Sequence, residues 1–290
     1  PMTIVLDGGA AGMMASLVAA DKGEHVLLIE KMEQPGRKLR ITGKGRCNLT
    51  NTAPLKDFLD HVGSDSRFLH NSFSRFFNQD LMEFFEHHGV PLVVERGNRV
   101  YPKSGKSLDI FLALIGTIER HPRITVMKNA TVKELIIEDS HIQGVLLSDG
   151  TCKGATKVIL ATGGKSYPLT GSTGEGYILA QKAGHTIVEP VPSLVPLVTQ
   201  DPIPEDLIGF TLKNVALHIG KHEFFGEMTF CKDGLAGPIV LSTSRMVCRQ
   251  LPLTVTLDLK PAIETAELDK RLIKDLDTNG TRLFHDALRI

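Results

Sequence analysis

The sequence predicts an α/β protein built around a parallel sheet, followed by a region of short β strands. Residues 3–30 read as strand, glycine turn, helix and strand, and Val158–Ala161 is a continuous apolar run, typical of a strand buried on both faces. The character of the chain then changes, because five prolines fall within positions 190–204. We therefore expect a first domain at 1–190, a β domain at 191–260 and a helical piece at 261–290.

The N-terminal pattern is a βαβ unit. Thr3–Leu6 and His25–Ile29 are short apolar runs, and the small and apolar residues between them continue to Ala20. Gly23 is the expected end of the helix, because glycine readily takes the left-handed conformation there. The second strand ends on Glu30.

The other expected elements follow from periodicity and turn residues. Residues 34–51 show no clear period and are expected to form a loop, and Asn78 is the expected N-cap of a helix that Gly89 ends. The remaining elements are a hairpin over 91–101, a helix over 108–118, a β meander over 131–154, a helix over 174–183, short strands within 207–259, and an amphipathic helix marked by Leu268, Leu272, Ile273 and Leu276.

Composition excludes several classes of function. The 290 residues carry 33 Lys+Arg and 33 Asp+Glu, so no net charge drives binding to nucleic acid or to an anionic membrane. None of the four cysteines forms a CxxC pair, which argues against a zinc site and fits a reducing compartment. We expect a cytoplasmic protein without a signal peptide or spanning segment, acting on a small molecule. The sequence leaves the oligomeric state open.

The first turn has the features of a dinucleotide site. Gly9 and Gly12 fill the second and third glycine positions, and Glu30 lies 18 residues after Gly12. Such glycines let the backbone and the helix N-terminus approach a pyrophosphate, while the acidic residue accepts ribose hydroxyls. Asp7 stands where the first glycine belongs, and its carboxylate would repel the pyrophosphate. The alternative is a structural glycine-rich turn without a ligand.

The segment Gly36–Asn51 combines glycines with five cations: Arg37, Lys38, Arg40, Lys44 and Arg46. Its glycines let backbone N–H groups face an anion that the cations neutralise, with Lys44 and Arg46 as the preferred contacts. A solvated basic loop and a nucleic-acid patch are the alternatives. The lack of aromatic residues in the segment argues against the second.

Five segments resemble, in order, the motifs of a bacterial flavoprotein family. Residues 36–51 resemble its GRK-x-x-[ST]G-x-GRCN-x-TN signature, and residues 158–176 (VILATGGKSYPLTGSTGEG) resemble its second long motif. Residues 99–104, 192–197 and 226–238 resemble three shorter ones. Members of this family are known as NAD(P)/FAD-dependent oxidoreductases, aminoacetone oxidases or 3-dehydro-bile-acid reductases.

The resemblance implies a Rossmann-like FAD-binding domain, an inserted β pseudo-barrel and a helical piece. It implies FAD as cofactor, with NAD(P)H as a transient electron donor at the substrate face, since the sequence has no second glycine-turn unit. The residues that it implies as cofactor contacts are Gly8, Gly9, Ala10, Ala11, Gly12, Glu30, Lys31, Arg37, Lys38, Thr42, Gly43, Gly45, Arg46, Cys47, Asn48, Val132, Ala161, Thr162, Gly163 and Gly174.

The sequence also departs from the family's motifs. Besides Asp7, Cys231-Lys232 stands where Thr-His is usual and Ala236 stands for Ser, so no catalytic acid or base is assigned. Members continue well past the position of Ile290, which predicts that the chain is a fragment. Cys47 is expected to be a buried, inert thiol rather than a redox group, and Tyr167 a packed side chain rather than a proton donor.

These observations favour an FAD-dependent oxidoreductase that moves a hydride between flavin and a small organic substrate. Two alternatives stay open. One is a flavoprotein-like binding module without cofactor, and the other is an FAD-dependent RNA-modifying protein.

Overall fold

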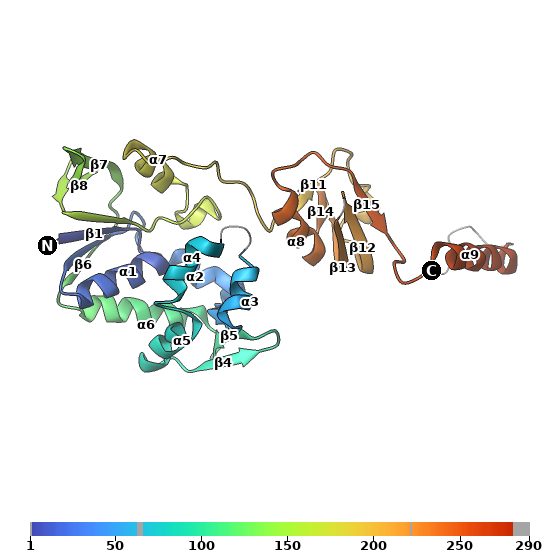
Figure 1. The fold of residues 1–290 in the computed structure, drawn as a ribbon, viewed down its shortest axis with the longest axis horizontal. Helices are drawn as coiled ribbons and strands as arrows, with labels where there is room; N and C mark the ends of the chain where they lie inside the picture. Colours follow the sequence, from blue (N-terminus) through green and yellow to red (C-terminus); the bar gives the residue numbers. More distant parts are fainter. Residues whose placement is uncertain (1, 63–65, 221, 281–290) are drawn as a thin grey trace. The chain divides into compact units, whose positions relative to one another are not determined.

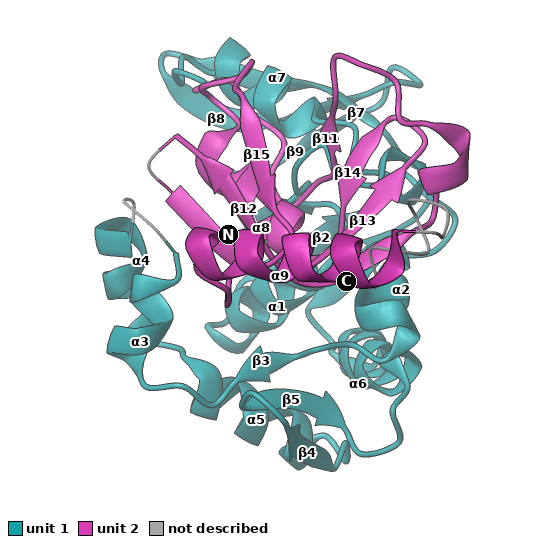
Figure 2. Cartoon of the chain, turned by 90° about the vertical axis from the view of Figure 1, so that its right-hand side faces the viewer, with its two compact units in different colours: residues 1–187 teal, residues 188–290 magenta. Residues whose placement is uncertain are grey.

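The computed structural model describes residues 2–62, 66–220 and 222–280. The chain divides into two compact units, Pro1–Ile187 and Val188–Ile290 (Figure 2). The boundaries that the sequence predicted at 190 and 260 stay a prediction.

Unit 1 is built on a four-stranded parallel sheet in the order β10-β1-β2-β6. Its strands are β1 (Met2–Leu6), β2 (His25–Ile29), β6 (Ile124–Met127) and β10 (Lys157–Leu160). Leu6 is in register with both Ile29 and Leu160, so the carboxyl ends of the three strands lie at one edge of the sheet. The βαβ prediction is confirmed, whereas β6 was not predicted, because four residues are too few to show a period.

Two layers cover the sheet, helices on one face and a β meander on the other (Figure 1). The helices are α1 (Ala10–Asp21) and α6 (Ser107–Arg120), and the other layer holds β7 (Val132–Glu138), β8 (His141–Leu147), β9 (Cys152–Gly154) and α7 (Glu175–Lys182). Alternate side chains of each strand point to opposite faces. One core therefore contains Val5, Leu28, Met13 and Leu17, and the other contains Ile4, Leu6, Leu27 and Val145.

β10 corrects one expectation. Its apolar run predicted a strand buried on both faces, but β10 is the edge strand of the described sheet and pairs only with β1 there. Leu160 is 37% exposed and Val158 and Ile159 are half-buried. An apolar run alone does not separate a central strand from an edge strand.

The basic segment is not a plain loop. Residues Arg37–Ile41 form the short helix α2, and a 3₁₀ turn, η1 (Thr42–Gly45), follows it. Gly36 takes the left-handed conformation (φ 70°) and accepts a hydrogen bond from the Arg40 N–H at 3.0 Å. Leu39 packs on the helix-side core, and the Ser107 hydroxyl donates to the Arg40 carbonyl. A five-residue helix is too short to show a helical period.

The lower part of unit 1 in Figure 1 holds a three-stranded antiparallel sheet, β3-β5-β4, with short helices. Its elements are β3 (Thr50–Asn51), α3 (Leu55–Asp60), α4 (Ser66–Phe73), α5 (Asn78–His87), β4 (Leu92–Glu95) and β5 (Arg99–Pro102). The hairpin and the end of α5 at Gly89 are confirmed, while α3 and α4 were not predicted. Asn78 is the first helical residue rather than the N-cap. Its amide donates to the Asn51 carbonyl, while the Phe77 N–H donates to Asp80.

Unit 2 contains an antiparallel sheet in the order β11-β14-β13-β12-β15. Its elements are β11 (Leu197–Val198), β12 (Thr211–Ile219), β13 (His222–Cys231), β14 (Gly234–Ala236), β15 (Val255–Asp258), η3 (Glu205–Leu207), α8 (Pro238–Val247) and α9 (Thr265–Asn279). Where the resemblance implied a pseudo-barrel, the described strands form an open sheet with edges at β11 and β15.

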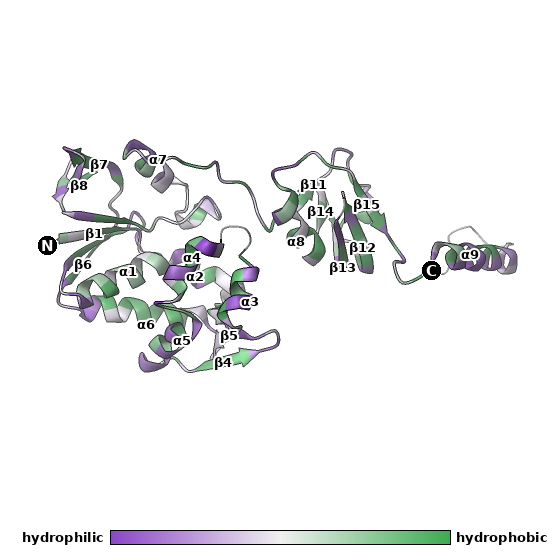
Figure 3. Ribbon diagram, in the orientation of Figure 1, coloured by the Kyte–Doolittle hydropathy of each residue, from purple (hydrophilic) through white to green (hydrophobic). Residues whose placement is uncertain are grey.

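Two helices of unit 2 bear on the predictions. The expectation of strands throughout 207–259 is wrong for α8, which buries Ile239, Val240 and Val247 at helical spacing in the core of unit 2. The final helix is confirmed as α9, which is coloured mostly as hydrophilic in Figure 3 and has no buried residue.

Candidate dinucleotide-binding site

Two neighbouring cavities lie at the carboxyl edge of the parallel sheet. The larger holds about 280 Å³ and the smaller about 30 Å³. Of the predicted contacts, the larger is lined by Gly9, Ala10, Ala11, Glu30, Arg37, Lys38, Thr42, Ala161 and Gly163, and the smaller by Lys31, Val132 and Thr162. Asp7 lines both, so the βαβ turn is the point at which the cavities meet. The roles of these residues toward a cofactor stay a prediction.

The glycines of this region allow close packing of the backbone. A Cβ at Gly12 would lie 1.8 Å from the Asp7 carbonyl oxygen, and one at Gly8 would lie 2.5 Å from the Pro35 Cβ. A Cβ at Gly36 would meet the Phe111 ring at 2.4 Å. Any larger residue would push α1 or the basic segment away from the sheet, so these glycines fix the walls of the larger cavity.

Glu30 is held in a fixed orientation at the end of β2. Its carboxylate accepts the Gly8 N–H at 2.9 Å and the Met32 N–H at 2.7 Å, and the residue is only 3% exposed. Two backbone donors satisfy a buried carboxylate and leave lone pairs free. Glu30 can therefore accept hydroxyl groups from a ligand in the larger cavity.

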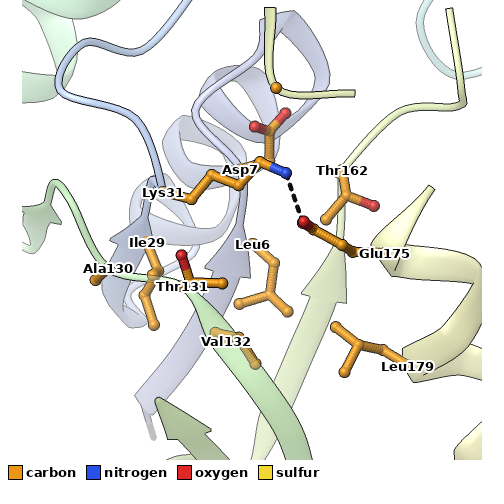
Figure 4. A pocket seen from close by; sticks show the side chains of 11 residues that line it. Leu6, Asp7, Ile29, Lys31, Ala130, Thr131, Val132, Thr162, Glu175 and Leu179 are labelled. Carbon is orange, nitrogen blue, oxygen red and sulfur yellow. Dashed lines mark hydrogen bonds and ion pairs between the residues drawn. The ribbon is translucent and has the colours of Figure 1, made fainter. Parts of the chain in front are cut away.

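Lys31 and Val132 belong to the smaller cavity, which is shown in Figure 4. The Lys31 ammonium extends to Glu175 at 2.6 Å and donates to the Thr173 hydroxyl at 3.1 Å. This pairing ties the end of β2 to the start of α7 and closes one side of the cavity. Val132 and Leu6 supply apolar walls.

Asp7 is the residue that sequence comparison marked as a departure, and the structure gives it an unusual environment. Its backbone is in the left-handed region (φ 84°), where glycine is favoured. Burial, together with the negative charge and hydrogen bonding of Glu30, raises the pKa of Asp7 to about 6. The Gly9 N–H and Lys31 act in the opposite direction. The two carboxyl groups therefore form a pair.

The structure separates Arg37 and Lys38 of the basic segment from Arg46. Arg37 and Lys38 line the larger cavity, and the Lys38 ammonium donates to the buried Ser172 hydroxyl at 2.6 Å. Arg46 instead pairs with Glu95 and lies 4.4 Å from the centre of the Tyr101 ring. The preferred anion contact predicted at Arg46 is thus engaged by protein groups and lines neither cavity.

A third cavity, of about 450 Å³, shares Lys38 and Thr42 with the cavity of about 280 Å³ described above. Gly43, Lys44 and Tyr167 also line it. The expectation that Tyr167 is packed is wrong, because 68% of this residue is exposed and its backbone is left-handed (φ 55°).

The other predicted contacts line none of these three cavities: Gly8, Gly12, Gly45, Arg46, Cys47, Asn48 and Gly174. Cys47 is 2% exposed, and burial raises the pKa of its thiol to about 11. A thiol with so little thiolate is a poor nucleophile, as expected for an inert core residue. Gly174 is the left-handed N-cap of α7.

Several lining residues were not predicted: Gln34, Leu39, Ala130, Thr131, Thr170, Gly171, Ser172 and Glu175. Ser172 and Glu175 fall inside the second long motif, so that motif could have indicated them. Gln34 and Thr131 carry no pattern of their own. Within the described ranges, no three His, Cys, Asp or Glu side chains are grouped to hold a metal ion, and no helix is long and apolar enough to cross a membrane.

The residues present fit a dinucleotide. Cations, the glycine turn and the N-terminus of α1 surround the larger cavity, a hydroxyl-accepting carboxylate lies at the end of β2, and apolar walls line the smaller cavity. The carboxyl of Asp7 is the one misfit. The fold and the site therefore define a dinucleotide-binding protein of the Rossmann class.

Comparison with known proteins narrows this class. Residues 1–281 match the family described as HI0933-like protein Rossmann domain, and the chain belongs to this FAD-binding family of oxidoreductases. It is 32% identical over 283 residues to a 3-dehydro-bile acid delta(4,6)-reductase of Clostridium scindens, covering 94% of this chain and 68% of the relative. It is 28% identical over 244 residues to a ribosomal RNA dihydrouridine synthase of Escherichia coli, covering 83% and 60%.

A solved structure shows the same fold. The open conformation of a flavocytochrome c3 fumarate reductase is 20% identical, with a TM-score of 0.50, covering 73% of this chain and 47% of that one. The chain thus spans 60% to 68% of the two curated relatives' lengths.

Proposed function

We propose that unit 1 binds FAD across the two cavities that meet at Asp7, and that the protein transfers a hydride between this flavin and a small organic substrate. The observation that carries the proposal is the position of the cavities. They lie at the carboxyl edge of the parallel sheet, on either side of a βαβ glycine turn, which is where such folds bind dinucleotides.

Each part of the chain has a distinct task in this proposal. The apolar walls at Val132 receive the adenine, and Glu30 accepts ribose hydroxyls. The N-terminus of α1, with Arg37 and Lys38, neutralises the pyrophosphate. Bound FAD would supply the hydride chemistry, while the protein positions it and excludes water.

The reaction is proposed to be the reduction of an activated carbon–carbon double bond. The names of both curated relatives support this, since one is a delta(4,6)-reductase and the other forms dihydrouridine. NAD(P)H is the proposed electron donor, reaching the flavin from the substrate side because the sequence has no second dinucleotide turn. Oxidation of an amine such as aminoacetone is a second substrate class for the same cofactor.

The test uses purified protein loaded with FAD under anaerobic conditions. NADH or NADPH should bleach the flavin absorbance, and a steroid 4,6-dien-3-one should restore it with formation of the reduced steroid. An NAD(P)H-reduced flavin that the dienone does not reoxidise, together with an oxidised flavin that aminoacetone does not reduce, would refute both small-molecule substrates.

The curated relatives also support a second candidate, an FAD-dependent enzyme that acts on RNA, because one of them is a ribosomal RNA dihydrouridine synthase. The zero formal net charge favours a small molecule over nucleic acid as the substrate. RNA binding that weakens steeply with salt, together with dihydrouridine formed in rRNA, would favour the RNA substrate. Failure to bind FAD under any condition would favour a binding module without cofactor.

A further inference from the structure

The Asp7 side chain occupies the place at which the turn should receive a phosphate. The carboxyl lines both cavities, and a Cβ built on Gly9 would lie 2.9 Å from its Oδ2. The backbone N–H of Gly9, the N-cap of α1, lowers the pKa of this carboxyl. The free N–H groups at a helix N-terminus are the groups that normally bind a phosphate. The carboxyl group of Asp7 thus lies where such a turn normally binds the phosphate of a ligand.

A second carboxyl group makes this position sensitive to protons. Glu30 is buried, lines the same cavity as Asp7 and raises the pKa of the Asp7 carboxyl, while its own oxygens accept the N–H groups of Gly8 and Met32. Neighbouring negative charges repel each other, so ionisation of Asp7 beside Glu30 is disfavoured. Protonation of Asp7 removes its negative charge from the turn.

We propose that Asp7 determines which ligands the site accepts, because the Asp7–Glu30 pair must hold a proton when a pyrophosphate binds. A ligand with a pyrophosphate, such as FAD, then binds with uptake of a proton, whereas a neutral nucleoside such as adenosine binds without it. This inference rests on the proposed function, since it concerns the same site.

The charged groups that face Asp7 come from the end of β2, from α2 and from the start of α7. Lys31 faces Asp7 from the end of β2, but its ammonium is paired with Glu175 of α7. Arg37 and Lys38 line the larger cavity from α2. The segment after β10 contributes Ala161, Thr162 and Gly163, none of which titrates.

The expected change of the Kd for FAD with pH follows from the pKa of about 6 that burial and Glu30 give to Asp7. A pyrophosphate beside the carboxyl raises this pKa further, since a neighbouring negative charge disfavours ionisation. FAD then binds mainly to the protonated site, and its Kd rises by up to about 50-fold between pH 6 and pH 8. Close to one proton is taken up per FAD near pH 7.

The experiment is isothermal titration calorimetry of the full chain with FAD at pH 6, 7 and 8, in buffers of different ionisation enthalpy. Asp7→Asn keeps the shape and removes the titrating group, and Asp7→Gly restores the glycine. Adenosine is the control ligand without a pyrophosphate. The proposal predicts proton uptake and the pH-dependent Kd for the wild type with FAD. Neither proton uptake nor a pH-dependent Kd should occur with adenosine as the ligand, or with FAD and the variant Asp7→Asn. If Asp7→Asn does not fold, Asp7→Gly provides the same comparison.

The outcomes separate the two proposals. FAD binding by the wild type with a Kd that does not change with pH, or a slope that persists in Asp7→Asn and Asp7→Gly, overturns the role of Asp7 and leaves the FAD site standing. Absence of FAD binding in the wild type and in both variants at every pH overturns the proposed function, and the role of Asp7 with it.

Discussion

Replacing Lys38 by methionine tests the arrangement of cations that the structure shows. Methionine keeps an unbranched apolar stem and removes the ammonium, which lines the larger cavity and donates to Ser172 at 2.6 Å. A hydrogen bond to a charged group contributes about 1.5–3 kcal/mol. If Lys38 contacts the pyrophosphate, its loss should raise the Kd for FAD about 10- to 150-fold.

Arg46→Met is the matched control from the same segment. The Arg46 guanidinium pairs with Glu95 and lies over the Tyr101 ring, and it lines neither of the two cavities. Its replacement should change the Kd for FAD less than about threefold, because an exposed ion pair contributes little and acts locally.

The assay is titration of each variant with FAD at pH 6, followed by the change in flavin fluorescence, with urea unfolding to confirm that both variants are folded. A Kd that is unchanged in Lys38→Met would refute the reasoning. So would an equal loss in both variants, since the segment would then act as a diffuse positive surface rather than through one placed cation.

Three further predictions follow from the same geometry. Gly12→Ala should lower the free energy of unfolding by about 3 kcal/mol, because its Cβ would meet the Asp7 carbonyl. Gly23→Ala has open space around it and should lower the free energy of unfolding by only about 1 kcal/mol, through backbone strain; equal losses in urea unfolding would contradict this. Iodoacetamide at pH 8 should label the exposed Cys152 in the native protein and leave Cys47 unmodified until unfolding; early labelling of Cys47 by mass spectrometry would show that its thiol is accessible. The folded pKa of Asp7, about 6, lies above the ordinary 3.8, so the folded state binds more protons between these values and the free energy of unfolding should fall as pH rises from about 4 to about 6. The loss relative to Asp7→Asn should reach at most about 3 kcal/mol, reduced by solvent screening, and parallel stability curves for the two proteins would count against it.

The elements that the sequence predicted are those whose pattern is local and long. α6 spans 14 residues with a clear period, and the meander β7–β9 has turn pairs between its strands. α2, α3 and β6 have five, six and four residues, which is too few to show a period, and tertiary contacts hold them in place. α8 has ten residues at helical spacing and was missed because it lies between strands.

The site divides in the same way. The βαβ turn and Glu30 follow from motif and spacing, since the strand–turn–helix geometry is local. The separation of Lys38 from Arg46 depends on partners 134 and 49 residues away, Ser172 and Glu95, which no pattern in the segment reveals. Asp7 was recognised as a departure, but its position in one cavity with Glu30, which raises its pKa, required the fold.

The most direct test of the FAD site is a measurement of cofactor content. Purified protein is incubated with excess FAD at about pH 6, freed of unbound ligand and then denatured, and the released flavin is identified and quantified. The account predicts about one FAD per chain for the wild type and much less for Lys38→Met. A wild-type protein that retains no flavin would contradict the assignment of these cavities to FAD.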